Sequence, residues 1–181
     1  MKRSSIHRGW FILVISVLNC FASLGLGRFS LGAILPFMKD GLMLSYTETG
    51  LVSSAVFMGY LIGAVGVGYL TNRCPTKSVL QAALLLIALG MLAALLAFGF
   101  WSAYLALFMI GLGSGGANVT SLSVVNRWFA AKYKGMALGI TNSGSSFGIM
   151  ISGSLVPMLM LVYMEGWRII WGILACTVIV I

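Results

Sequence analysis

Long apolar runs, interrupted by few charged residues, dominate the pattern of hydrophobic and polar positions along the chain. The first run, Gly9–Met38, contains one charge, Arg28, and the stretch 78–126 contains none in 49 residues. A membrane-spanning helix needs about 20 apolar residues, so this stretch predicts two spans. Trp favours the membrane interface, which places the turn between them at 99–102. The whole pattern predicts six helices, at about residues 10–38, 46–70, 78–99, 102–127, 133–163 and 166–181.

The composition supports membrane insertion. Apolar residues make up 60% of the chain and charged residues only 8%, whereas about 25% of an average soluble domain is charged. Short apolar runs also occur in the buried helices of large soluble proteins, but a chain of 181 residues cannot bury this much apolar surface in a soluble fold. We therefore predict an all-α membrane protein with six transmembrane helices, in contact with membrane lipid.

Few residues are available for catalysis. The chain has three acids and one histidine, and its three cysteines lie far apart without a metal-like spacing. It also lacks the phosphate-binding sequence G-x-x-x-x-G-K-[ST], which disfavours ATP-driven transport. We therefore expect no enzyme activity, no metal and no cofactor. The 11 Lys and Arg residues are scattered singly between apolar runs, so nucleic acid is not an expected partner.

The basic residues predict the orientation of the helices. With the N-terminus in the cytoplasm, eight of them lie on the cytoplasmic side and two, Lys39 and Arg168, lie outside. Cytoplasmic loops of membrane proteins are enriched in Lys and Arg. The eight cytoplasmic basic residues are Lys2, Arg3, Arg8, Arg73, Lys77, Arg127, Lys132 and Lys134.

The last predicted helix is short for a membrane span. Residues 167–181 number 15 and extend about 22 Å as a helix, whereas the hydrocarbon core is about 30 Å thick. A short, tilted helix in a thinned bilayer is one explanation. We favour the other, that the chain is a fragment of a longer protein or the product of an interrupted gene.

A weak internal repeat divides the chain into two parts. Gly25-Leu26-Gly27 recurs 86 residues later as Gly111-Leu112-Gly113. Because three is an odd number, two successive sets of three helices cross the membrane in opposite directions. Such an inverted repeat is typical of secondary transporters. We therefore predict two inverted three-helix repeats, 1–99 and 100–181, although a chance coincidence also accounts for one tripeptide.

With these features the sequence resembles the N-terminal half of a major facilitator superfamily transporter. The most specific motif of that family is a loop between helices two and three, G-x-x-x-D-[RK]-x-G-[RK]-[RK]. Here Asn72 replaces the acid of the motif, and Pro75 and Thr76 replace a glycine and a base. The resemblance implies a cytoplasmic gating loop, weakened by the lost carboxylate, whereas an ordinary basic turn is the alternative. The gating-loop candidates are Gly68, Asn72, Arg73 and Lys77.

The second half of the sequence adds to the resemblance. Trp128-Phe129 and a basic turn precede a helix with Gly135, Gly139, Gly144 and Gly148. This is similar to the monocarboxylate and oxalate–formate porters, and helix one looks like a little-characterised bacterial permease group. The arginine usual on helix four is replaced by Leu107. The resemblance implies half of a twelve-helix fold, a missing C-terminal half as partner, and a location in the bacterial inner membrane.

Arg28 is the sharpest candidate for substrate contact. An arginine inside a spanning helix is costly and normally faces protein or a water-filled cavity. On an α-helix Gly25 and Gly32 share its face, so we expect open space beside the guanidinium. No acid lies at its depth to pair with it. An anionic substrate is one possible partner, since guanidinium and carboxylate groups pair bidentately. The alternative is a structural arginine, bonded to helix carbonyls or to the absent half.

Other polar residues at depth are weaker candidates for the substrate path. Such groups most often form hydrogen bonds between helices, which is the alternative for each of them. Pairs of glycines four residues apart, 59 with 63 and 144 with 148, more simply predict packing faces. The candidate substrate-binding residues, together with Arg28, are Tyr60, Asn118, Ser121, Asn142 and Ser146.

These features predict a secondary transporter that moves a small organic anion, carboxylate-like, by alternating access. The alternative is a non-transporting membrane subunit, a truncated product or scaffold that needs a second half. An intramembrane enzyme is disfavoured because all three acids and the histidine fall outside the apolar runs of the predicted spans.

Overall fold

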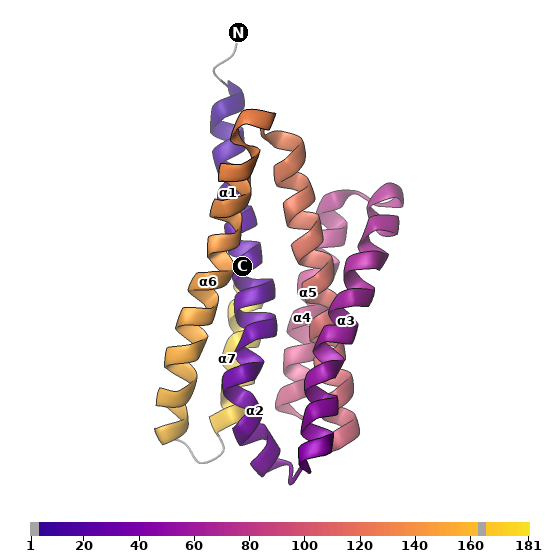
Figure 1. Cartoon of the computed structure of the whole chain (residues 1–181), viewed down its shortest axis with the longest axis vertical. Coiled ribbons are helices and arrows are strands. Elements are labelled where there is room, and N and C mark those ends of the chain that lie inside the picture. Colours follow the sequence, from indigo (N-terminus) through magenta and orange to yellow (C-terminus); the bar gives the residue numbers. More distant parts are fainter. Residues whose placement is uncertain (1–3, 163–165) are drawn as a thin grey trace.

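The computed structural model describes residues 4–162 and 166–181 as a bundle of long helices, with no strand in those ranges. Figure 1 shows most helices running roughly along the long axis of the molecule. The elements are α1 (Ser4–Cys20), the π-helical segment η1 (Phe21–Phe29), α2 (Ser30–Gly41), α3 (Tyr46–Arg73), α4 (Thr76–Leu95), α5 (Phe100–Trp128), α6 (Ala131–Val162) and α7 (Gly166–Val180).

The six predicted helices are all present. α1, η1 and α2 follow one another without a break and together form the first of them (Figure 1). Within the part of the chain that the structure describes, four helices are long and apolar enough to cross a membrane, and α7 is a shorter apolar helix. Six crossings therefore stay a prediction, while the all-helical class is confirmed. The predicted helix end at residue 163 lies outside the described residues, as do Lys2, Arg3 and Glu165.

The predicted turn at 99–102 is wrong by several residues. α4 ends at Leu95 and α5 begins at Phe100, so the connection lies at 96–99. The hydroxyl of Ser102 accepts hydrogen bonds from the N–H groups of Phe98 and Gly99, each at 3.1 Å. Ser102 is the third residue of α5, and a side chain at this position that accepts from the N–H of the residue before the helix stabilises the helix start. Ser102 therefore supports the start of α5 and is not part of the turn.

α5 is the central helix of the bundle and packs against α3 and α4. Its most apolar window is 67% buried, against 33% for that of α3. Glycines bring α3 and α5 together backbone to backbone. A Cβ at Gly59 or Gly63 would overlap the α5 backbone, and one at Gly111 or Gly115 would overlap carbonyls of α3. The predicted packing role of Gly59 and Gly63 is confirmed.

α6 packs against the first helix in the same way. A Cβ at Gly144 would overlap the carbonyl of Val17, and one at Gly148 would come within 2.5 Å of the Cα of Gly25. The predicted packing role of this second glycine pair is confirmed too. α7 is tied to α4 by Arg168, whose Nη1 donates a hydrogen bond of 2.8 Å to the carbonyl of Leu95.

The glycine contacts predict a difference between two alanine substitutions on the same helix. Gly63→Ala inserts a methyl group against the α5 backbone, and overpacking of this kind costs about 1–3 kcal/mol. Gly66→Ala is the matched control, because a Cβ there meets nothing within 4 Å. We expect the first change alone to lower the free energy of unfolding, measured by denaturant titration in detergent micelles. Equal stability of the two variants would contradict the close contact.

Candidate functional site

Arg28 lies at the end of η1, where the first helix passes α3. It is half-buried and is the next-to-last residue of the π-helical segment. Turns of π-helix inside α-helices are rare overall, and those that occur are often found at functional sites. The hydrophobic pattern predicted one regular helix here, so this irregularity is a finding of the structure.

Aromatic rings surround the guanidinium of Arg28. Its Cζ lies 4.4 Å from the ring centroid of Tyr60 and 4.6 Å from that of Phe57. The ring of Phe29 is also within reach, at 5.4 Å. Residues three apart share one face of a helix, so Tyr60 and Phe57 approach Arg28 together from α3. Each ring face attracts the cation electrostatically.

The Nε atom of Arg28 is buried and has no hydrogen-bond partner among the described residues. Among the described residues, the ion pair that is present joins Lys39 and Asp40, at 3.7 Å, and does not involve Arg28. The aromatic contacts therefore stabilise the charge of Arg28 without the help of a carboxylate. Its in-plane N–H donors are left for another acceptor.

A hydrogen-bond network links the aromatic face to α5 and α1. The amide nitrogen of Asn118 donates to the hydroxyl of Tyr60 at 2.8 Å. The thiol of Cys20 donates a weak hydrogen bond to the amide oxygen of Asn118 at 3.8 Å. Since the Tyr60 oxygen is the acceptor of the first bond, its own proton can be donated elsewhere. The structure thus brings Arg28, Tyr60 and Asn118 into one cluster that three helices share.

A hollow of about 150 Å³ lies beside Arg28, between the first helix and α3. A Cβ at Gly32 would meet nothing within 4 Å, which confirms the open space predicted there. The same expectation for Gly25 is wrong, because a Cβ there would lie 2.6 Å from the Cα of Gly148. The residues that line the hollow are Arg28, Phe29, Leu31, Gly32, Leu35, Ser53, Val56 and Phe57.

The other candidate residues are not joined to this cluster by any hydrogen bond within the described ranges. Ser121 is buried on α5, and its hydroxyl has no partner there. Asn142 and Ser146 are exposed on α6, one turn apart. These three residues keep the status of predictions.

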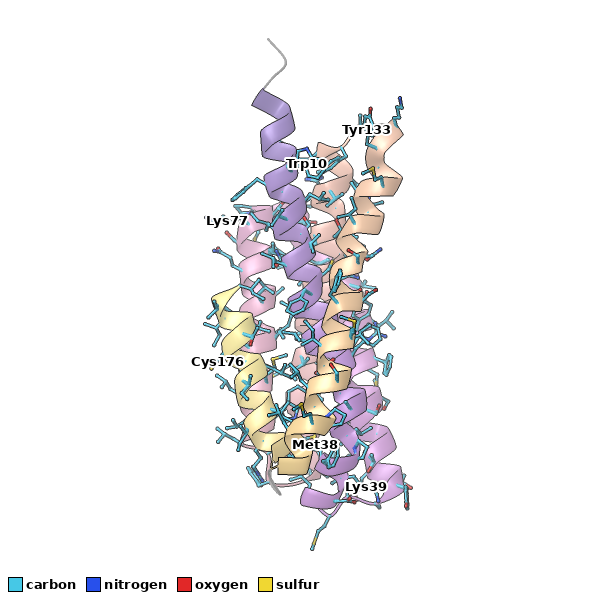
Figure 2. The ribbon with its side chains drawn as sticks, turned by 90° about the vertical axis from the view of Figure 1, so that its left-hand side faces the viewer. Trp10, Met38, Lys39, Lys77, Tyr133 and Cys176 are labelled. Carbon is cyan, nitrogen blue, oxygen red and sulfur yellow. The ribbon has the colours of Figure 1, made fainter. Side chains whose placement is uncertain are left out.

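The predicted gating loop lies at the junction of α3 and α4, at the end of the bundle that carries Lys77 in Figure 2. Asn72, Arg73 and Lys77 are all exposed. The guanidinium of Arg73 lies over the ring of Tyr69, at 4.8 Å, within the same helix. A Cβ at Gly68 would meet nothing within 4 Å, so this glycine is not needed for packing inside the chain.

A sequence comparison decides the family. The profile of the Major Facilitator Superfamily matches residues 17–181. The chain belongs to the Major Facilitator Superfamily. It is also 32% identical, over 159 residues, to the hexuronate transporter of Bacillus subtilis (strain 168). The aligned residues cover 88% of this chain and 36% of that protein. The family and this relative are transporters, so the chain is an integral membrane protein of a transporter family and not a member of an enzyme family.

Solved structures agree with the fold of the superfamily. The crystal structure of tetrameric PepTSo2 matches 98% of this chain with a TM-score of 0.79 and 19% identity. The crystal structure of PepTSo, a transporter of the POT family, matches 93% with a TM-score of 0.71 and 20% identity. The chain spans 36% of the length of the curated relative and 39% and 35% of these two structures. At such identity the structures show the fold alone.

Sequence reasoning missed two members of the cluster, Phe57 and Cys20. A signal for Phe57 was present, since it lies three residues before Tyr60 and shares its helix face. Cys20 gave none, because a lone cysteine in an apolar run is usually a small core residue.

Two substitutions of Tyr60 separate the roles of its ring and its hydroxyl. Tyr60→Phe keeps the ring beside Arg28 and loses one interhelical hydrogen bond, worth about 0.6 kcal/mol on average in membrane proteins. Tyr60→Leu also removes a cation–π contact, worth up to about 2 kcal/mol where water is excluded. We expect the leucine variant to have the lower free energy of unfolding. Tyr69→Leu, beside the exposed Arg73, is the control and should change it little. Equal losses for both Tyr60 variants would show that the ring does not stabilise Arg28.

Proposed function

We propose that this chain forms the N-terminal half of a secondary transporter that carries a small organic anion across the bacterial inner membrane by alternating access. The observation that carries the proposal is Arg28, a cation deep in an apolar helix with an unpartnered Nε. A superfamily transporter binds its substrate near the middle of the membrane, between its two halves. The predicted three-helix repeats, 1–99 and 100–181, are part of this proposal.

A carboxylate is the ligand that suits Arg28 best. The guanidinium group presents its N–H donors in a planar fork that matches the two oxygens of a carboxylate. The hexuronate of the relative's name is such a compound, with one carboxylate and several hydroxyl groups. Tyr60 offers its hydroxyl proton beside Arg28, which suits a substrate hydroxyl. Asn118 orients that hydroxyl through its 2.8 Å hydrogen bond and remains a candidate itself. Ser121, Asn142 and Ser146 remain further candidates for the same path.

The size of the hollow supports the need for a second half. Ligand sites usually enclose about 300–1,000 Å³, whereas the hollow beside Arg28 is about 150 Å³. It has room for a carboxylate group and a few water molecules, but not for the whole of a sugar acid. A non-transporting subunit that needs a second half is therefore the second candidate function. We propose the loop from Gly68 to Lys77 as the cytoplasmic gate of the assembled transporter.

Substitution of Arg28 tests the anion site in a permease that contains this chain. Arg28→Lys keeps the charge but loses the planar fork, so uronate affinity should fall while folding survives. In Arg28→Ala the uronate affinity should fall further, by about 10- to 100-fold, because a hydrogen bond to a charged group contributes about 1.5–3 kcal/mol. Binding of a radiolabelled uronate measures the effect, and the corresponding neutral hexose is the ligand control. Its weaker binding should be unchanged by Arg28→Ala.

The pattern of the two variants distinguishes substrate contact from a structural role. A well-folded Arg28→Ala permease that binds the uronate with undiminished affinity would rule out Arg28 as the contact. If Arg28→Ala instead fails to fold and Arg28→Lys loses little, Arg28 is structural. The polar residues of α5 and α6 would then be the better candidates.

The proposed orientation places Cys74 in the cytoplasm. Cys74 is exposed between α3 and α4, whereas Met43 is 93% exposed between α2 and α3, at the other end. In a background of Cys20→Ala and Cys176→Ala, a membrane-impermeant thiol reagent should label Cys74 only after the cells are permeabilised. A Met43→Cys variant that also carries Cys74→Ala is the control and should be labelled in intact cells. The reverse pattern would invert the orientation.

A further inference from the structure

An apolar groove lies at the end of the bundle where α1 begins, far from Arg28. Its volume is about 460 Å³, and it is formed by the start of α1, the end of α5 and the first turns of α6. Figure 2 shows Trp10 and Tyr133, two of its lining residues, at the end of the molecule opposite Lys39. The floor is apolar, because Leu13 and Ala137 are buried there and Phe129 packs against them.

The rim of the groove carries large residues that are open to the surroundings. Trp10, Trp128, Tyr133 and Met136 line it and are each more than half exposed. Trp and Tyr are enriched where the hydrocarbon of a membrane meets its headgroups. The groove therefore lies at the depth where a lipid exposes both a chain and a headgroup.

Positive charge borders the groove on the α6 side. The ammonium of Lys132 lies 5.6 Å from the ring centroid of Tyr133, which is part of the groove wall. Lys134 lies two residues further along α6, so the two lysines flank the Tyr133 face from opposite sides. The first N–H groups of α6 add the positive end of a helix dipole. Asp40 and Glu48, the acids among the described residues, lie beside the α2–α3 junction, at the end that carries Lys39 in Figure 2, opposite the groove.

We infer that this groove binds an anionic phospholipid of the adjacent leaflet, with an acyl chain on the apolar floor and the phosphate beside Lys132 and Lys134. Basic pockets between transmembrane helices on the cytoplasmic side are suited to anionic headgroups. The charge favours this occupant over a neutral lipid. The apolar floor favours it over a soluble phosphate. The inference rests on the family's membrane location and on the proposed cytoplasmic orientation of this end, and it is independent of the substrate that we propose.

Native mass spectrometry of the chain released from mixed bilayers tests the inference. The bilayers contain phosphatidylcholine with phosphatidylglycerol, and the measured quantity is the ratio of the two lipids retained. Each juxtamembrane lysine favours anionic lipid by about fivefold, so Lys132→Gln with Lys134→Gln should lower the preference for phosphatidylglycerol by roughly 30-fold. The matched control is Arg73→Gln with Lys77→Gln, which removes two charges at the same end but outside the groove and should keep the preference.

A second variant tests the groove itself. A Cβ at Gly9 would meet only the ring of Phe129, at 3.8 Å, so Gly9→Leu extends into the groove without touching a charge. We expect this variant, and Ala130→Trp at an exposed lining position, to lose the bound phosphatidylglycerol while melting at the wild-type temperature. Two results would overturn the inference. One is an equal loss in the control pair, which indicates attraction by charge alone. The other is undiminished retention when a well-folded variant fills the groove.

Discussion

The backbone contact between α3 and α5 is the constraint on which the candidate site depends. A Cβ at Gly115 would overlap the carbonyl of Tyr60, so the two helices touch without intervening side chains at this level. Asn118 lies three residues further along α5, on the same side, and at this separation its amide reaches the Tyr60 hydroxyl at 2.8 Å. A side chain at Gly115 would move α3 away and open that bond. The ring of Tyr60 would then leave Arg28.

The energetics of Arg28 explain why the site needs aromatic residues and no acid. An arginine at the centre of a spanning helix costs about 2.5–3.5 kcal/mol on insertion scales. Two ring faces, at about 0.5–2 kcal/mol each depending on how far water is excluded, offset part of that cost. A carboxylate partner would offset it too, but would also occupy the N–H donors. The rings of Phe57 and Tyr60 lie against the charge, and Nε has no hydrogen-bond partner among the described residues.

The sequence predicted the helices and the principal charge because both follow from strong local signals. Charge-free runs mark helices in a membrane, and a single Arg28 within such a run is conspicuous. The glycine pairs at 59 and 63 were predictable because small residues four apart form helix contacts. Which helix each pair meets depends on the tertiary arrangement, which one sequence does not contain. The turn after α4 was misplaced because the preference of Trp for the interface marks a depth in the membrane and not the residue at which a helix begins. The Ser102 hydroxyl supports a helix start before Trp101.

The error at Gly25 has a geometric cause that also explains the position of Arg28. In an α-helix, residues three apart point about 60° from each other, so Gly25 and Arg28 would share one face. In a π-helix, with about 4.4 residues per turn, the same pair diverges by about 115°. Because both lie in η1, Gly25 packs against α6 while Arg28 turns toward the rings on α3. The π-helical segment thus separates a packing contact from the proposed binding residue, Arg28, whereas an α-helix would place the two together.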